Sequence, residues 1–95
     1  MTRHAKVLLR VLRGTSDAAI DFDDLCGLLR RLGFTERRRG GSHRIFVREG
    51  VEEILNLQPR TGGEAKPYQV KQVRQMIVRY GLSRQLDEEA SSDGE

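Results

Sequence analysis

Residues 37–46 read Arg37-Arg38-Arg39-Gly40-Gly41-Ser42-His43-Arg44-Ile45-Phe46. Three arginines lead into two glycines, and a serine and a histidine precede the return to apolar residues. Arginine binds phosphate well, glycine lets the backbone turn tightly and approach a ligand closely, and histidine exchanges a proton readily near neutral pH. The stretch therefore predicts a basic turn that delivers a histidine to the start of a strand.

The sequence on both sides of this turn is typical of short antiparallel strands. The three segments with this character are 34–39, 43–48 and 51–57. Glu49-Gly50 predicts a tight turn between the second and third segments, and Pro59 follows the third. Two hairpins in series make a meander, and residues 61–65 are expected to form a flexible loop.

Two helices supply apolar stripes that can cover such a sheet. In the first, Asp21 can cap the start of the helix and Gly33 suits the position after its end. Its stripe consists of Phe22, Leu25, Leu28, Leu29 and Leu32, with Cys26 beside it as a small core residue. The second opens at Pro67, a residue that suits the first helical position, and carries Val70, Val73, Ile77 and Tyr80.

A shorter helix is expected at residues 3–13, ending at Gly14. The order is then helix, helix, three strands, helix. Three antiparallel strands need one covered face. We therefore predict an α+β two-layer sandwich: a three-stranded antiparallel sheet with helices on one face, plus an extra N-terminal helix. A single domain would span residues 1–84, with the extra helix at 2–14 and the core at 21–82.

The charge of the chain is unevenly distributed. The 95 residues contain 17 Lys and Arg against 14 Asp and Glu, a net charge of +3. Five of the acidic residues lie in residues 85–95, which contain no Lys or Arg, so residues 1–84 keep nine against 17 and carry +8. We expect the acidic tail to be disordered. A basic body predicts a polyanionic partner, most commonly nucleic acid, although an arginine-rich proteome would give the same composition.

Composition also excludes several classes. There is no run of 18 apolar residues, and the N-terminus lacks the apolar run of a signal peptide. Cys26 is the only cysteine, which excludes an internal disulfide and a cysteine-rich zinc site. A cytoplasmic protein without a metal or other cofactor is the simplest expectation.

His43 is the candidate catalytic residue. A ribonuclease needs a group that takes the 2′-hydroxyl proton or protonates the leaving 5′-oxygen, and a histidine can do either without metal. Arginines nearby can neutralise the charge that develops on phosphorus. The alternative is a strand-edge histidine that only hydrogen-bonds a carbonyl. His4, the other histidine, is expected to be an exposed surface residue far from any cluster.

Lys66 precedes the helix that opens at Pro67, and phosphate binds readily at helix N-termini. It could equally be a solvated loop lysine. No partner at a recognisable spacing activates Ser42, which predicts a turn residue or a phosphate contact.

From Phe22 to Leu82 the chain resembles the HicA-type toxins of toxin–antitoxin pairs. Four ordered pieces carry the resemblance: Leu28-Leu29-Arg30-Arg31-Leu32-Gly33-Phe34, the Gly-Ser-His motif in Arg39-Gly40-Gly41-Ser42-His43-Arg44-Ile45-Phe46, Leu57-Gln58-Pro59, and Lys66-Pro67 with the helix that follows. The resemblance covers about two-thirds of the chain. It departs from the family at Arg44, where many relatives have a second histidine, in an additional glycine in the turn, and in the N-terminal helix and acidic tail.

This resemblance implies a double-stranded-RNA-binding-domain-like fold and a metal-independent endoribonuclease that cleaves mRNA. His43 would be the catalytic residue, and a HicB-type antitoxin would bind over the site. We expect RNA contacts at Arg37, Arg39, Gly41, Ser42, Arg44 and Lys66. Two other classes stay open: a non-catalytic RNA-binding module, and a DNA-binding protein that uses residues 67–80 as a recognition helix.

Overall fold

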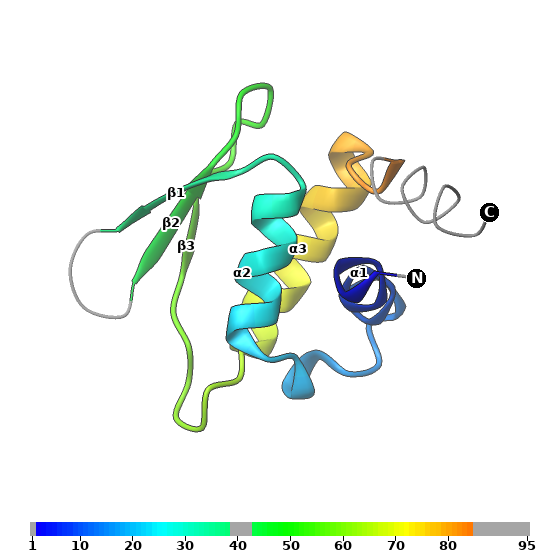
Figure 1. Cartoon of the computed structure of the whole chain (residues 1–95), viewed down its shortest axis with the longest axis vertical. Helices are drawn as coiled ribbons and strands as arrows, with labels where there is room; N and C mark the ends of the chain where they lie inside the picture. The colour runs from blue at the N-terminus through cyan, green and yellow to red at the C-terminus, as the bar shows by residue number, and fades with distance from the viewer. Residues whose placement is uncertain (1, 39–42, 85–95) are drawn as a thin grey trace.

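The computed structural model describes residues 2–38 and 43–84 (Figure 1). Its helices are α1 (Arg3–Arg13), the 3₁₀ helix η1 (Asp17–Ala19), α2 (Phe22–Arg31) and α3 (Pro67–Tyr80). Its strands are β1 (Thr35–Arg38), β2 (Arg44–Val47) and β3 (Leu55–Leu57). The predicted order of elements is confirmed, with η1 added where a plain linker was expected.

The three strands form one antiparallel sheet in the order β1-β2-β3. The third strand is shorter than the predicted 51–57, because pairing with β2 begins at Phe46 opposite Leu55. Residues 51–54 contact α3 instead of pairing with β2. The Tyr80 hydroxyl donates a hydrogen bond to Glu53 Oε1 at 2.5 Å and accepts one from the Glu52 N–H at 3.4 Å. The bond to Glu53 raises the pKa of the Tyr80 hydroxyl above its ordinary value.

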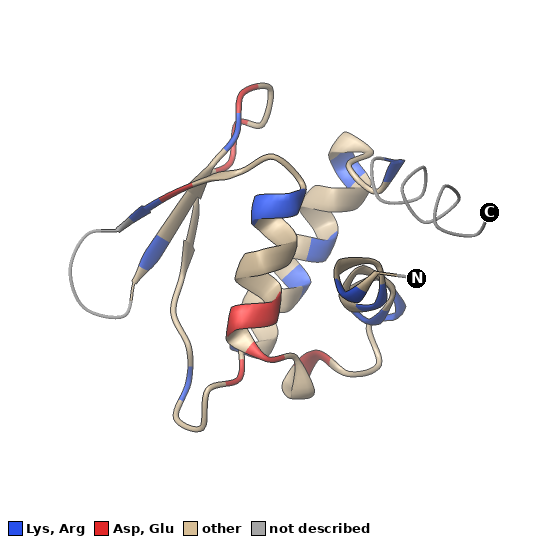
Figure 2. Cartoon of the chain, in the orientation of Figure 1, with Lys and Arg blue, Asp and Glu red and all other residues tan. Residues whose placement is uncertain are grey.

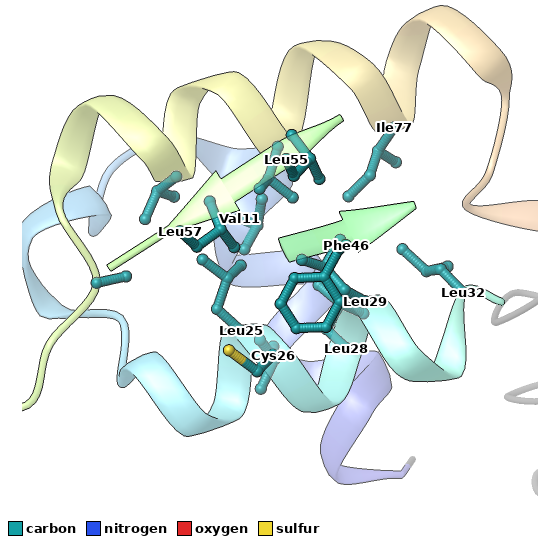
Figure 3. Packing of buried hydrophobic residues seen from close by; sticks show 14 of the residues in the cluster. Val11, Leu25, Cys26, Leu28, Leu29, Leu32, Phe46, Leu55, Leu57 and Ile77 are labelled. Carbon is teal, nitrogen blue, oxygen red and sulfur yellow. The ribbon is translucent and has the colours of Figure 1, made fainter. Parts of the chain in front are cut away.

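One face of the sheet packs on α2 and α3 (Figure 1). Phe46, Leu55 and Leu57 point into this core and are almost completely buried, together with the leucines of α2 (Figure 3). Burial of an apolar side chain of this size stabilises the fold by roughly 1.5–3 kcal/mol. The predicted α+β fold, with a three-stranded sheet covered by helices on one face, is therefore confirmed.

Local signals set the ends of α2 as expected. The Asp21 side chain accepts a hydrogen bond from the Asp24 N–H at 3.1 Å, which satisfies one of the free donors of the first turn. The chain leaves the helix at Gly33, whose φ of 94° is strained for any other residue.

Helix α1 forms a further layer on the side of α2 and α3 away from the sheet (Figure 1). Gly27 on α2 permits close approach, since a Cβ there would lie 3.2 Å from His4 Nε2. His4 is therefore half-buried against α2, and the expectation of an exposed surface histidine is wrong. On the α3 side, Arg74 donates to the Val11 carbonyl and pairs with Asp17 at 2.9 Å.

Residues 58–66 are tied to the start of α2 rather than loose. The Ala65 N–H donates to the Ile20 carbonyl at 2.8 Å. The backbones of Glu64 and Asp21 pair as an isolated antiparallel β-bridge. The predicted loop is thus an ordered turn, which fixes the position from which α3 begins. Within residues 2–38 and 43–84, no helix is long and apolar enough to cross a membrane.

Candidate functional site on the open face of the sheet

The pairing of the strands decides which side chains share the uncovered face. Ile45 lies opposite Arg37 on β1 and Asn56 on β3, while its neighbour Phe46 faces the core. Successive residues alternate between faces. His43, two residues before Ile45, therefore lies on the open face with Arg37 and Asn56, and all three are exposed.

His43 has a specific partner on the neighbouring strand. Its Nδ1 lies 3.2 Å from Asn56 Oδ1. An amide oxygen only accepts hydrogen bonds, so this contact favours a proton on Nδ1. In the neutral ring the other nitrogen, Nε2, then carries the lone pair, and in the charged ring it carries the exchangeable proton. Asn56 can in this way fix the orientation of the imidazole.

A buried glutamine holds the strand that carries Asn56. Gln69 of α3 is only 5% exposed, and both ends of its side-chain amide are bonded to β3 or to the residue after it. Its Nε2 donates to the Asn56 carbonyl at 3.0 Å, and its Oε1 accepts from the Gln58 N–H at 3.1 Å. The backbone beneath the His43 partner is thereby fixed to the helix layer.

Lys66 joins this end of the sheet through Gln58. The last β2–β3 pair is Arg44 with Leu57, so His43 and Gln58 stand one residue beyond it on their two chains. Lys66 Nζ donates to Gln58 Oε1 at 3.2 Å, and Lys66 occupies the N-cap position of α3. His43 and Lys66, two of the predicted site residues, are thus brought to the same end of β3.

Arg44 is placed on the other face. Its guanidinium lies 3.6 Å from Asp23 and stacks over the Phe22 ring at 5.3 Å. It also interacts with the thiol of Cys26, although burial dominates there and raises the pKa of Cys26 to about 11. The predicted phosphate contact of Arg44 would have to be made away from His43.

Three other predicted RNA contacts, Arg39, Gly41 and Ser42, lie outside the described residues. Conversely, sequence reasoning missed Asn56, Gln58 and Gln69. The signal for Asn56 was present, because a polar residue between Leu55 and Leu57 in a strand must face away from the core. Gln69 carried no such signal, since a glutamine in a helix is usually solvated.

The part of the chain that the structure describes contains no group of three His, Cys, Asp or Glu side chains that could hold a metal ion. The side chains that the structure brings together at this end of the sheet are an oriented imidazole, amide groups and cations. In chemical terms it can transfer a proton and bind an anion.

The fold and the site together define a small α+β domain that carries a histidine and cations at the uncovered face of a three-stranded sheet. Residues 22–79 match the family model described as the HicA toxin of bacterial toxin–antitoxin. Since the match covers more than half of the chain, the protein belongs to the HicA toxin family, and the resemblance seen in the sequence is confirmed. Membership implies a toxin role and an antitoxin partner. Searches of curated proteins and of solved structures gave no match.

Proposed function

We propose that this toxin is a metal-independent endoribonuclease that cleaves mRNA, with His43 as its general acid or base. The observation that carries the proposal is the 3.2 Å contact between His43 Nδ1 and Asn56 Oδ1 on an exposed face. A ring held through one nitrogen offers the other to a ligand in a defined direction. Such orientation is what proton transfer in a transition state requires.

The chemistry follows from RNA itself. When the 2′-hydroxyl attacks the adjacent phosphorus, it loses a proton and the 5′-oxygen leaves with one. The neutral His43 ring can accept the first proton at Nε2, or the charged ring can supply the second. Asn56 Oδ1 stays bonded to the Nδ1 proton in both forms, so the ring need not turn between them.

Cations at the same end of the sheet would hold the phosphate. Arg37 lies exposed on the His43 face, and Lys66 stands at the N-terminus of α3, where the helix dipole also favours an anion. Arg39, Gly41 and Ser42 lie within four residues before His43 in sequence and are proposed to contact the RNA backbone.

The same face suits the antitoxin, which we propose is of the HicB type. Ile45 and Val47 are only half-buried on the strand that follows His43, and Ile54, next to β3, is 67% exposed. Apolar side chains beside cations fit a partner with an apolar centre and an acidic rim. Bound there, the antitoxin would exclude RNA, so saturating antitoxin should abolish RNA binding in a competition titration.

The test is RNA cleavage by the wild type and by His43→Ala, both in excess EDTA. We expect the wild type to cleave without metal and the variant to lose on the order of 10²–10⁴ in rate with an unchanged melting temperature. His4→Gln is the matched control, because it removes the other imidazole, which lies between α1 and α2. Cleavage by His43→Ala within about threefold of wild type would refute the assignment. RNA that wild type binds but does not cut would indicate the non-catalytic module.

A further inference from the structure

Helix α1 carries a line of cations on its outer side. Arg3, Lys6, Arg10 and Arg13 are spaced by three, four and three residues, which places them on one stripe of a helix, and all four are exposed. The helix contains no Asp or Glu. At 1.5 Å per residue the stripe is about 15 Å long. We call these four residues the basic stripe.

Most of this charge is not neutralised by the residues that the structure describes. Arg3 pairs with Asp24 at 2.6 Å. Arg10 donates to the Ala19 carbonyl at 3.2 Å, a contact that orients its guanidinium but leaves the charge in place. Over the described ranges, Lys6, Arg10 and Arg13 have no carboxylate within ion-pair distance. Three cations without an ion pair among the described residues therefore follow one another on one side of the helix. Figure 2 shows Lys and Arg, and no Asp or Glu, on α1.

The residues around the basic stripe indicate which of three partners it fits best: a membrane, a protein or a nucleic acid. Membrane binding by a basic helix needs a free apolar face, and here that face is buried, because Val7, Leu8 and Val11 pack against α2 and α3. A protein interface needs a buried apolar anchor, and the outer side of α1 offers only Leu9, which is 37% exposed. A row of cations without an apolar centre fits a phosphodiester backbone.

We infer that the basic stripe is a second RNA-binding surface, which holds a distal part of the same strand that His43 cleaves. This inference rests on the proposed function. The stripe precedes the residues that match the family model, so it belongs to the part added to the family core. It lies behind α2 and α3, two layers of about 10 Å each from the sheet. Only an RNA longer than the His43 site can reach both surfaces.

Length dependence is thus the signature of the second surface. With the rise of about 3.4 Å per nucleotide of a strand in duplex DNA as a guide, an RNA of about four nucleotides spans about 14 Å and reaches only one surface, whereas about 20 nucleotides reach both. The test variant is Lys6→Gln/Arg10→Gln/Arg13→Gln, and the control is Lys71→Gln/Arg79→Gln/Arg84→Gln, which removes the same charge from exposed positions elsewhere. Both are made in the His43→Ala background for binding and in wild type for cleavage.

For the 20-nucleotide RNA we expect the stripe variant to bind about tenfold or more weakly at low salt, with the slope of log affinity against log salt reduced by about 2. The control should change affinity by less than about threefold. Cleavage of the four-nucleotide RNA should be the same for wild type and stripe variant. Both variants should melt like their parent, because the substituted side chains are exposed.

Equal binding of long RNA by the stripe variant and the control would overturn the inference. Loss of antitoxin binding with RNA affinity intact would overturn it too, and would make the stripe a protein surface. Tighter binding of duplex DNA than of RNA through the stripe would overturn the choice of RNA. Absence of cleavage in wild type, with the length-dependent loss of binding still present, would reject the ribonuclease proposal but retain the second RNA surface.

Discussion

The two faces of the sheet are formed by the same strands but differ in their surroundings: one packs against helices and the other is exposed to solvent. On the covered face, Phe46, Leu55 and Leu57 pack against α2 and α3 and are almost completely buried. On the open face, Asn56 of β3 and His43, which directly precedes β2, are exposed and hydrogen-bonded to each other. Packing fixes the first set, while the second set is free of the core and available for chemistry. A substitution should therefore cost stability on one face and function on the other.

The largest expected effect on stability is at Phe46. Phe46→Ala should lower the free energy of unfolding by about 3–5 kcal/mol, because it removes a ring from the closed core. Ile45→Ala, the neighbouring residue on the open face, should cost only about 1 kcal/mol. Urea unfolding of both variants measures the difference. Equal costs would mean that the open face is covered in the intact protein.

The next effect concerns Cys26, beneath the covered face. Burial raises the pKa of its thiol from 9.0 to about 11, so at pH 8 about one hundredfold less thiolate is present than in the unfolded chain. We expect a disulfide reagent to label the folded protein at least about one hundredfold more slowly than the protein in guanidinium. Rapid labelling of the folded protein would show that α2 is not packed as described.

A smaller effect links the two faces through Gln69. Gln69→Ala leaves the Gln58 N–H without its partner and should cost about 1–3 kcal/mol. The same change should lower the cleavage rate at temperatures where the variant is still folded, because the strand under Asn56 is no longer fixed. Gln72→Ala, at an exposed position of α3, is the control. Loss of stability with an unchanged rate would limit Gln69 to a structural role.

The covered face was predictable from the sequence because buried apolar residues recur at the regular spacing of a helix or a strand. The leucines of α2, the cap at Asp21 and the stop at Gly33 all follow local rules, and the structure confirms them. The third strand was predicted too long. Val51 and Ile54 suggested a strand, but Glu52 and Glu53 between them bond to Tyr80, which is distant in sequence, and residues 51–54 do not pair with β2. Such contacts between distant residues leave no periodic signal.

The open face was predictable only in part. His43 and Lys66 stood out by residue type and by their positions after a turn and before a helix. The contact of His43 with Asn56 depends on the register of β2 and β3, and that of Lys66 with Gln58 on the path of the chain after β3; neither can be predicted from local sequence. Arg44 illustrates the same limit: adjacent to His43 in sequence, it belongs to the opposite face and lies over Phe22.

The most direct test of proton transfer by the open face is the chemistry of the cleaved ends. Wild-type toxin is incubated with RNA in excess EDTA, and the termini of the fragments are identified by mass spectrometry. Attack by the 2′-hydroxyl with proton transfer at His43 predicts a 2′,3′-cyclic phosphate on one fragment and a 5′-hydroxyl on the other. Fragments with a 5′-phosphate, or cleavage that needs added magnesium, would contradict a metal-independent reaction at His43.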